Sequence, residues 1–208
     1  MRKRDFLGER VPAIVFAHWR GRPLYIFLVY LLGQSMIDPP SFLLTVLFLA
    51  FVTRLPLQRF VGPVAALIGG MIVVVYVFYH VLTPTIRRFL ATLIADELPG
   101  QALATAAWRE ALAFPPRVVG WVAVVSVVVY TLSTVLFTPR FGFSLALIGS
   151  VVGLTATVGL TQVIFLFYLE WAMAPVARLA LAAGARPELE ELQAVRLPLW
   201  LKLLLLIL

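Results

Sequence analysis

Long apolar segments constrain this chain more than any other feature. Residues 61–83, 118–138 and 141–169 contain no Asp, Glu, Lys or Arg. A helix rises about 1.5 Å per residue and the hydrocarbon core of a bilayer is about 30 Å thick, so each segment is long enough to cross a membrane. The composition agrees, because 62% of the residues are hydrophobic and the mean hydropathy is +1.00. We therefore predict an all-α, polytopic helical membrane protein.

A further apolar region, residues 24–53, is interrupted by the sequence IDPP at 37–40. Two arrangements fit it. The region is one crossing, kinked or broken at Pro39 and Pro40, or it is a re-entrant hairpin whose halves are each short for a crossing. Charge favours the single crossing, which makes four full transmembrane helices.

The basic residues set the expected orientation. With one crossing at 24–53, all of the 17 basic residues except Arg54, Arg59 and Arg140 lie on the side of the N-terminus. Because basic residues concentrate on the cytoplasmic side of membrane proteins, we predict a cytoplasmic N-terminus.

The chain divides into spans and connectors. We predict a basic N-terminal cytoplasmic or interfacial segment (1–22), a first transmembrane pair (23–83, its first helix kinked at 37–40), a cytoplasmic connector (84–117), a second transmembrane hairpin (118–169), a second cytoplasmic connector (170–196) and the start of a fifth span (197–208). We expect amphipathic helices in the connectors, which are rich in helix-forming residues.

The last segment, LPLWLKLLLLIL at 197–208, is apolar nearly all round. Twelve residues of helix rise only about 18 Å, so they cannot cross a bilayer. A helix lying flat on the membrane would show a polar face, so we favour a truncated fifth span over a surface helix.

The two connectors begin alike. Pro84 and Arg87 after the second span align with Pro175 and Arg178 after the fourth. The pattern indicates a helical hairpin plus connector used twice, although Pro and Arg are also common where helices leave a membrane. Gly184 is predicted to end the Ala-rich helix of the second connector.

Asp38 is the acid closest to the middle of an apolar region. Charges at membrane depth are costly and are often functional, so one interpretation is an ion or proton site at a broken helix. The alternative is a surface turn or a break lined by protein. The neighbouring polar residues are Gln34, Ser35 and Ser41.

The fourth span contains several glycines. Gly149, Gly153 and Gly159 have the spacing that lets helices approach closely, either within the chain or between two copies. Internal packing is favoured, and a homodimer through transmembrane helices is the alternative.

Several functions are not expected. The chain has no Cys, and no catalytic triad, carboxylate pair, phosphate loop or metal-ligand cluster can be assembled from its sequence. We therefore expect no enzyme activity in these residues and no cofactor. The net charge of +7 comes from Arg beside apolar runs, which suits a lipid bilayer as the partner and argues against nucleic acid.

Residues 107–125 and 167–208 resemble the membrane region of bacterial membrane-bound adenylate/guanylate cyclases. The shared features are a basic, proline-containing approach to a span (Arg109, Pro115, Pro116, Arg117), an exit helix (Glu170, Pro175, Val176, Leu179, Ala180) and a second basic, proline-containing turn (Arg196, Pro198). In that family six spans precede a HAMP linker and a class III cyclase domain. Sensor histidine kinases have similar membrane input regions.

The resemblance implies a membrane-anchoring, signal-transmitting region in the bacterial inner membrane, with the catalytic domain beyond Leu208. The candidates for signal transmission are Pro84, Arg87, Pro175, Arg178 and Gly184. Two alternatives are a small ion or solute transporter centred on Asp38 and a non-catalytic membrane assembly protein that binds a partner helix.

Overall fold

The computed structural model describes residues 11–155 and 162–186. Its elements are η1 (Ala13–Phe16), β1 (His18–Trp19), β2 (Arg22–Pro23), α2 (Tyr25–Thr53), α3 (Gln58–Val81), α4 (Pro84–Ile94), α5 (Gln101–Phe141), α6 (Phe143–Thr155) and α7 (Gln162–Ala182). Four helices, α2, α3, α5 and α7, are long and apolar enough to cross a membrane. The predicted all-α class with four full spans is confirmed. The predicted start of a fifth span at 197–208 lies outside the described residues.

Helix α2 runs through Pro39 and Pro40 as one 29-residue helix. The single-crossing interpretation of residues 24–53 therefore describes the structure, and the re-entrant hairpin does not. Both proline rings lie on the exposed side of the helix. In its N-terminal half, α2 approaches α7 closely at Gly33. A β-carbon added there would lie 3.0 Å from the rings of both Phe165 and Tyr168.

The predicted boundary between the first connector and the third span does not exist as a break. Helix α5 is continuous from Gln101 to Phe141, about 60 Å long, and includes residues assigned to both. Pro115 and Pro116 lie inside it and do not end it. The sequence 101–117 is rich in helix formers, and its buried face continues the buried face of the span.

The predicted fourth span, residues 141–169, includes α6 and the start of α7. Helix α6 turns back along α5 after Gly142, whose φ of +82° makes the tight turn between them. After residues 156–161, which are outside the described part, α7 continues along α5 to Ala182. Residues 170–182, assigned to the second connector, are therefore the end of a membrane-length helix.

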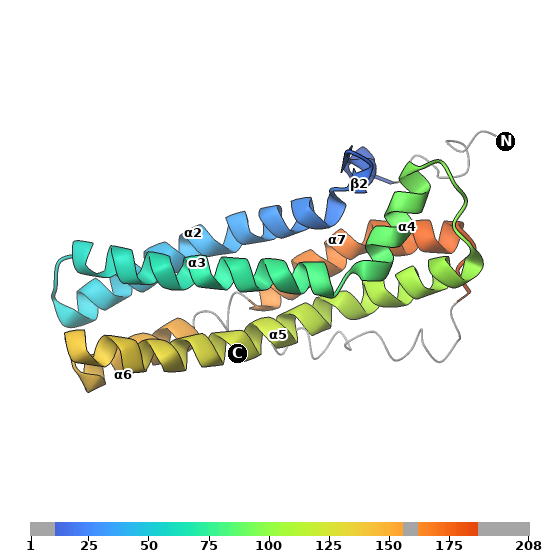
Figure 1. The fold of residues 1–208 in the computed structure, drawn as a ribbon. Helices are drawn as coiled ribbons and strands as arrows, with labels where there is room; N and C mark the ends of the chain where they lie inside the picture. Colours follow the sequence, from blue (N-terminus) through green and yellow to red (C-terminus); the bar gives the residue numbers. More distant parts are fainter. Residues whose placement is uncertain (1–10, 156–161, 187–208) are drawn as a thin grey trace.

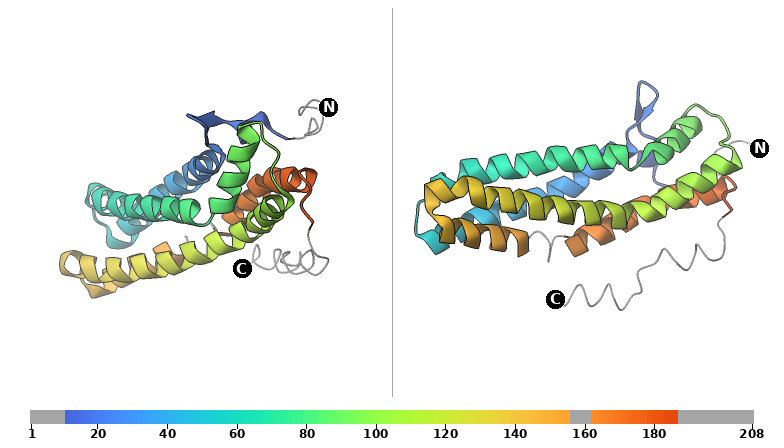
Figure 2. Two further views of the ribbon diagram at one scale, coloured as in Figure 1. Left: turned by 45° about the vertical axis from the view of Figure 1, so that its right-hand side comes forward. Right: turned by 60° about the horizontal axis from the view of Figure 1, so that its bottom comes forward.

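The helices form an elongated bundle with two different ends (Figure 1). One end, here called the connector end, contains η1, the β1–β2 hairpin, α4, the start of α5 and the end of α7. The other, the loop end, contains the α2–α3 and α5–α6 turns (Figures 1 and 2). Of the described basic residues, only Arg54, Arg59 and Arg140 belong to the loop end. The three predicted exceptions are thus on the opposite end from the connectors.

One hydrophobic core joins the membrane helices to the connector end. It includes Val75 and Phe165 within the spans and Phe89, Trp108 and Leu179 at the connector end. Helix α4 buries Ile86, Phe89 and Leu90 while Arg88 is exposed, so it is amphipathic as predicted.

The described part of the basic N-terminal segment forms a short hairpin that was not predicted. Arg20 and Gly21 both have positive φ, as the two-residue turn of a tight hairpin requires. Val15 is fully buried in the common core, whereas Ile14 and Trp19 are exposed. The segment therefore packs on the bundle through η1, at the connector end.

Candidate functional site

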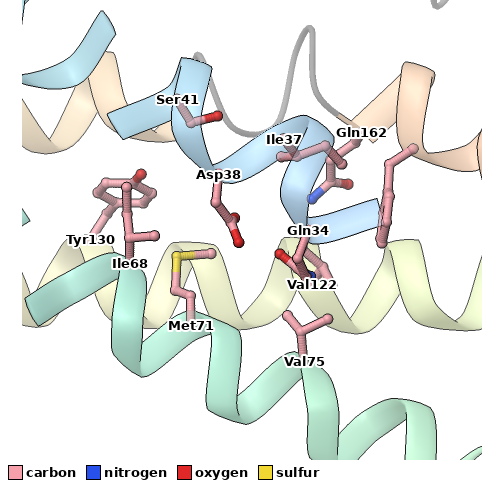
Figure 3. Close-up of a pocket in the computed structure, with 11 residues that line it drawn as sticks. Gln34, Ile37, Asp38, Ser41, Ile68, Met71, Val75, Val122, Tyr130 and Gln162 are labelled. Carbon is pink, nitrogen blue, oxygen red and sulfur yellow. The ribbon is translucent and has the colours of Figure 1, made fainter. Parts of the chain in front are cut away.

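A largely apolar pocket with a polar centre lies between the helices at the level of Asp38 (Figure 3). Its lining comes from four helices: Gln34, Ile37, Asp38 and Ser41 on α2, Ile68, Met71 and Val75 on α3, Val122 and Tyr130 on α5, and Gln162 and Phe165 on α7. Its free volume is about 50 Å³, enough for a few water molecules. Asp38 is the only charged side chain among these lining residues.

Gln34 and Asp38 form the polar centre of the pocket. They are four residues apart on α2, which places them on the same face of the helix. With its nitrogen turned toward Asp38, the Gln34 amide donates to Oδ1 at 2.9 Å and to Oδ2 at 2.8 Å. Figure 3 shows both side chains directed into the space between α2 and α3. This pair neutralises no charge, because the amide is uncharged.

The backbone next to Asp38 lacks two hydrogen-bond donors. Pro39 and Pro40 have no N–H, so the carbonyls of Ser35 and Met36 receive no bond from the positions that would normally serve them in α2. Ser35, Met36, Pro39 and Pro40 are all exposed, so this interruption lies on the outer side of α2, whereas Gln34 and Asp38 face the pocket.

Gln162 closes the pocket from α7 and ties that helix to α5. Its side chain is 7% exposed. In the orientation that satisfies its neighbours, the amide nitrogen donates to the carbonyl of Val119 at 3.3 Å and the amide oxygen accepts from the N–H of Ala123 at 3.1 Å. A buried amide with both ends bonded fixes the register of the two helices.

Tyrosine hydroxyls connect the helices between the pocket and the connector end. Tyr25 donates to the carbonyl of Ala172 at 2.6 Å, Tyr30 to that of Ile72 at 2.8 Å, and Tyr168 to that of Val29 at 2.6 Å. These bonds join α2 to both α3 and α7. Such bonds between transmembrane helices are worth about 0.6 kcal/mol on average, so together they favour one arrangement of the bundle.

Glu110 on α5 caps the start of α4. Its carboxylate accepts from the backbone N–H of Thr85 through both oxygens and from that of Ile86 through Oε1, each at 3.1 Å. Pro84 occupies the first turn and has no N–H, so one carboxylate meets the next two free donors of the helix. Sequence reasoning missed this role, since Glu110 is 25 residues from Thr85 and capping residues are normally local.

Arg87 caps the end of α3. Its Nη2 donates to the carbonyl of His80 at 2.8 Å and its Nε to that of Thr83 at 3.3 Å. Pro84 cannot bond the His80 carbonyl as a helix would require, so the guanidinium supplies the missing donor. Arg87 and Glu110 thus hold the α3–α4 corner from its two sides.

The two Pro-x-x-Arg sequences have different structural places. Pro84 begins the separate helix α4, whereas Pro175 lies inside the continuous helix α7. Arg87 is bonded to the end of α3, and Arg178 is exposed. The proposed duplication therefore does not extend to equivalent connectors.

Gly184 ends α7 as predicted. Its φ is +92°, its N–H bonds the carbonyl of Leu181 at 3.0 Å, and the N–H of Ala185 bonds that of Ala180 at 3.0 Å. This bonding pattern is the Schellman motif, which favours glycine at the left-handed position.

Gly149 and Gly153 pack within the chain. A β-carbon added to Gly149 would lie 2.8 Å from Cδ2 of Leu49 on α2, and one added to Gly153 would overlap the ring of Tyr130 on α5. Beside them, Ser150 bonds Ser133 at 3.1 Å and also accepts from Thr134. This face of α6 is occupied by the chain's own helices. Gly159 lies outside the described residues.

Among residues 11–155 and 162–186, no group of three or more His, Asp or Glu side chains could hold a metal ion. Comparison with protein-family models, curated proteins and solved structures finds no match to the chain.

Proposed function

We propose that this chain is the membrane-anchoring and signal-transmitting region of a bacterial signalling protein. The output we favour is an adenylate/guanylate cyclase domain on the same polypeptide. The proposal rests on the resemblance through Glu170, Pro175 and Leu179 and on the architecture of the helices that carry these residues. The basic residues of the connector end support the bacterial inner membrane as the location, with that end in the cytoplasm.

The observation that carries the proposal is the continuity of α5 and α7 from the intramembrane pocket to the connector end. Val122 of α5 and Phe165 of α7 lie at the pocket, while Trp108 and Leu179 of the same helices lie in the core of the connector end. The two helices contact each other more extensively than any other pair. Because packed helices shift as bodies, a displacement at the pocket is carried to the connector end.

The connector end is built to follow such a displacement. Helix α4 is bonded to α5 through Glu110, and α3 is bonded to α4 through Arg87. Pro175 leaves the carbonyl of Trp171 without its helical N–H donor, which makes α7 easier to bend there. A stimulus that binds one arrangement of the bundle better than another would then increase the population of that arrangement, at the pocket and at the connector end together.

The first experiment is to read the natural gene beyond codon 208. A class III cyclase domain after a sixth span and a HAMP linker supports the proposal in its full form. A histidine kinase domain supports the signalling role with a different output. A stop codon directly after Leu208 would contradict the signalling proposal.

A second experiment tests the coupling. Membranes containing the full-length protein are assayed for cyclic nucleotide formation with Pro175→Ala, which restores the missing N–H in α7. The expected result is a changed basal rate with an unchanged amount of protein in the membrane. Leu181→Ala, a change at an exposed position of the same helix, is the matched control and should leave the rate unaltered. Equal rates for the wild type and Pro175→Ala would contradict a role for α7 in transmission.

A second candidate function is a small ion or solute transporter, and the position of Asp38 in a pocket between four helices favours it. In reconstituted vesicles, Asp38→Asn should then abolish flux of the transported ion. Unchanged flux in that variant would reject the transporter.

A further inference from the structure

We propose that the pocket around Asp38 binds a monovalent metal cation of the sodium type. The cation would be held by the Asp38 carboxylate together with uncharged oxygen atoms from the surrounding helices. This site is independent of the signalling output proposed above, because it depends only on residues of the membrane bundle.

The first argument is the balance of charge. Asp38 lies near the middle of α2, about 20 Å from either end of a helix long enough to span the bilayer. An ionised carboxylate at that depth is costly unless an opposite charge accompanies it. The pocket lining supplies no Lys, Arg or His, and Gln34 supplies only an uncharged amide. A bound cation would provide the missing positive charge.

The second argument is the set of donor atoms. The side-chain oxygens of the lining belong to Gln34, Asp38, Ser41, Tyr130 and Gln162, and the Gln162 amide is already bonded to α5 at both ends. Hard cations prefer oxygen ligands, and the lining offers no imidazole or thiolate and only the Met71 thioether as a sulfur ligand. A single carboxylate balances one positive charge, which favours a monovalent over a divalent ion.

The third argument is space. The free volume of about 50 Å³ admits a cation with part of its hydration shell. Figure 3 shows the Asp38 carboxylate pointing into this space rather than toward the outside of the bundle.

The site would also link the helices that surround it. An ion bound to Asp38 of α2 and to the Tyr130 hydroxyl of α5 would favour the close arrangement of these two helices. The occupied bundle should therefore be more stable than the empty one.

The experiment is thermal unfolding of the purified 208-residue chain in detergent, followed by Trp fluorescence. Sodium chloride replaces choline chloride at constant ionic strength and pH. We expect a saturable rise in the unfolding midpoint, about 5 °C or more at roughly 100 times the Kd. Binding of radioactive sodium should saturate near one ion per chain.

Two variants make the result specific. Asp38→Asn keeps the size of the side chain and should abolish both the sodium-dependent rise and the binding of radioactive sodium. Ser35→Ala is the matched control, because Ser35 is exposed on the same helix and its hydroxyl bonds only the Leu32 carbonyl, at 2.9 Å. This variant should retain both effects.

Three outcomes would overturn the proposal. Equal midpoints in sodium and choline chloride would mean that no specific ion binds. A sodium effect that survives Asp38→Asn would place the ion elsewhere. A midpoint that rises on acidification in choline chloride, with no response to sodium, would mean that Asp38 holds a proton instead of a metal cation.

Discussion

The carboxylate of Glu110 is expected to hold α4 against the bundle. It accepts three contacts of 3.1 Å from the first two free N–H groups of α4. Ile86 is fully buried, so its N–H has no access to solvent once the carboxylate is removed. Hydrogen bonds to a charged group are worth about 1.5–3 kcal/mol, and a negative charge at a helix N-terminus adds about 0.3–1 kcal/mol.

From these values, Glu110→Ala should destabilise the attachment of α4 by about 2–3 kcal/mol, which is roughly a 30-fold to 160-fold increase in its opening. Glu110→Gln should cost less, about 1 kcal/mol, because the amide oxygen still accepts one N–H but carries no charge. If the α4 attachment is destabilised more by Glu110→Ala than by Glu110→Gln, and by Glu110→Gln relative to the wild type, Glu110 acts as a cap and does not merely fill volume.

Hydrogen–deuterium exchange of the peptide covering residues 84–94, followed by mass spectrometry, measures this opening directly. Exchange should rise in the order wild type, Glu110→Gln, Glu110→Ala, while peptides from the loop end stay unchanged. Glu97→Gln is the control, since Glu97 is an exposed acid beyond the other end of α4. Equal exchange of this peptide in the wild type and Glu110→Ala, or an equal increase with Glu97→Gln, would refute the reasoning.

Three further predictions concern the packing of Gly153 and the hydroxyls of Tyr79 and Tyr25. Gly153→Leu should lower the unfolding midpoint strongly, because the new side chain must displace Tyr130. Gly120→Leu is the control and should have little effect, because the space around a β-carbon at Gly120 is open. Equal midpoints for the two variants would contradict internal packing of Gly153. Tyr79→Phe should not lower stability, since among the described residues the buried Tyr79 hydroxyl has no hydrogen-bond partner. Tyr25→Phe should cost about 0.6 kcal/mol by losing its bond to the Ala172 carbonyl, and reversible unfolding in mixed micelles would separate the two tyrosines.

Part of the candidate site was readable from the sequence. Asp38 stands out because acids are rare within apolar segments, and the helical spacing of four residues places Gln34 on its face. The contributions of Tyr130 and Gln162 were not readable. They lie about 90 to 125 residues from Asp38, and only the packing of α5 and α7 against α2 brings them to the same pocket.

The sequence by itself determined the all-α class, the four membrane-length helices and the grouping of basic residues, because hydrophobic length and charge act locally along the chain. Tertiary structure alone decided that α5 runs unbroken from the connector into the span, that Glu110 caps α4, and that the α6 glycines face the chain's own helices. These features depend on which helix faces meet. That choice is made by side-chain packing between segments far apart in sequence, which no local pattern records.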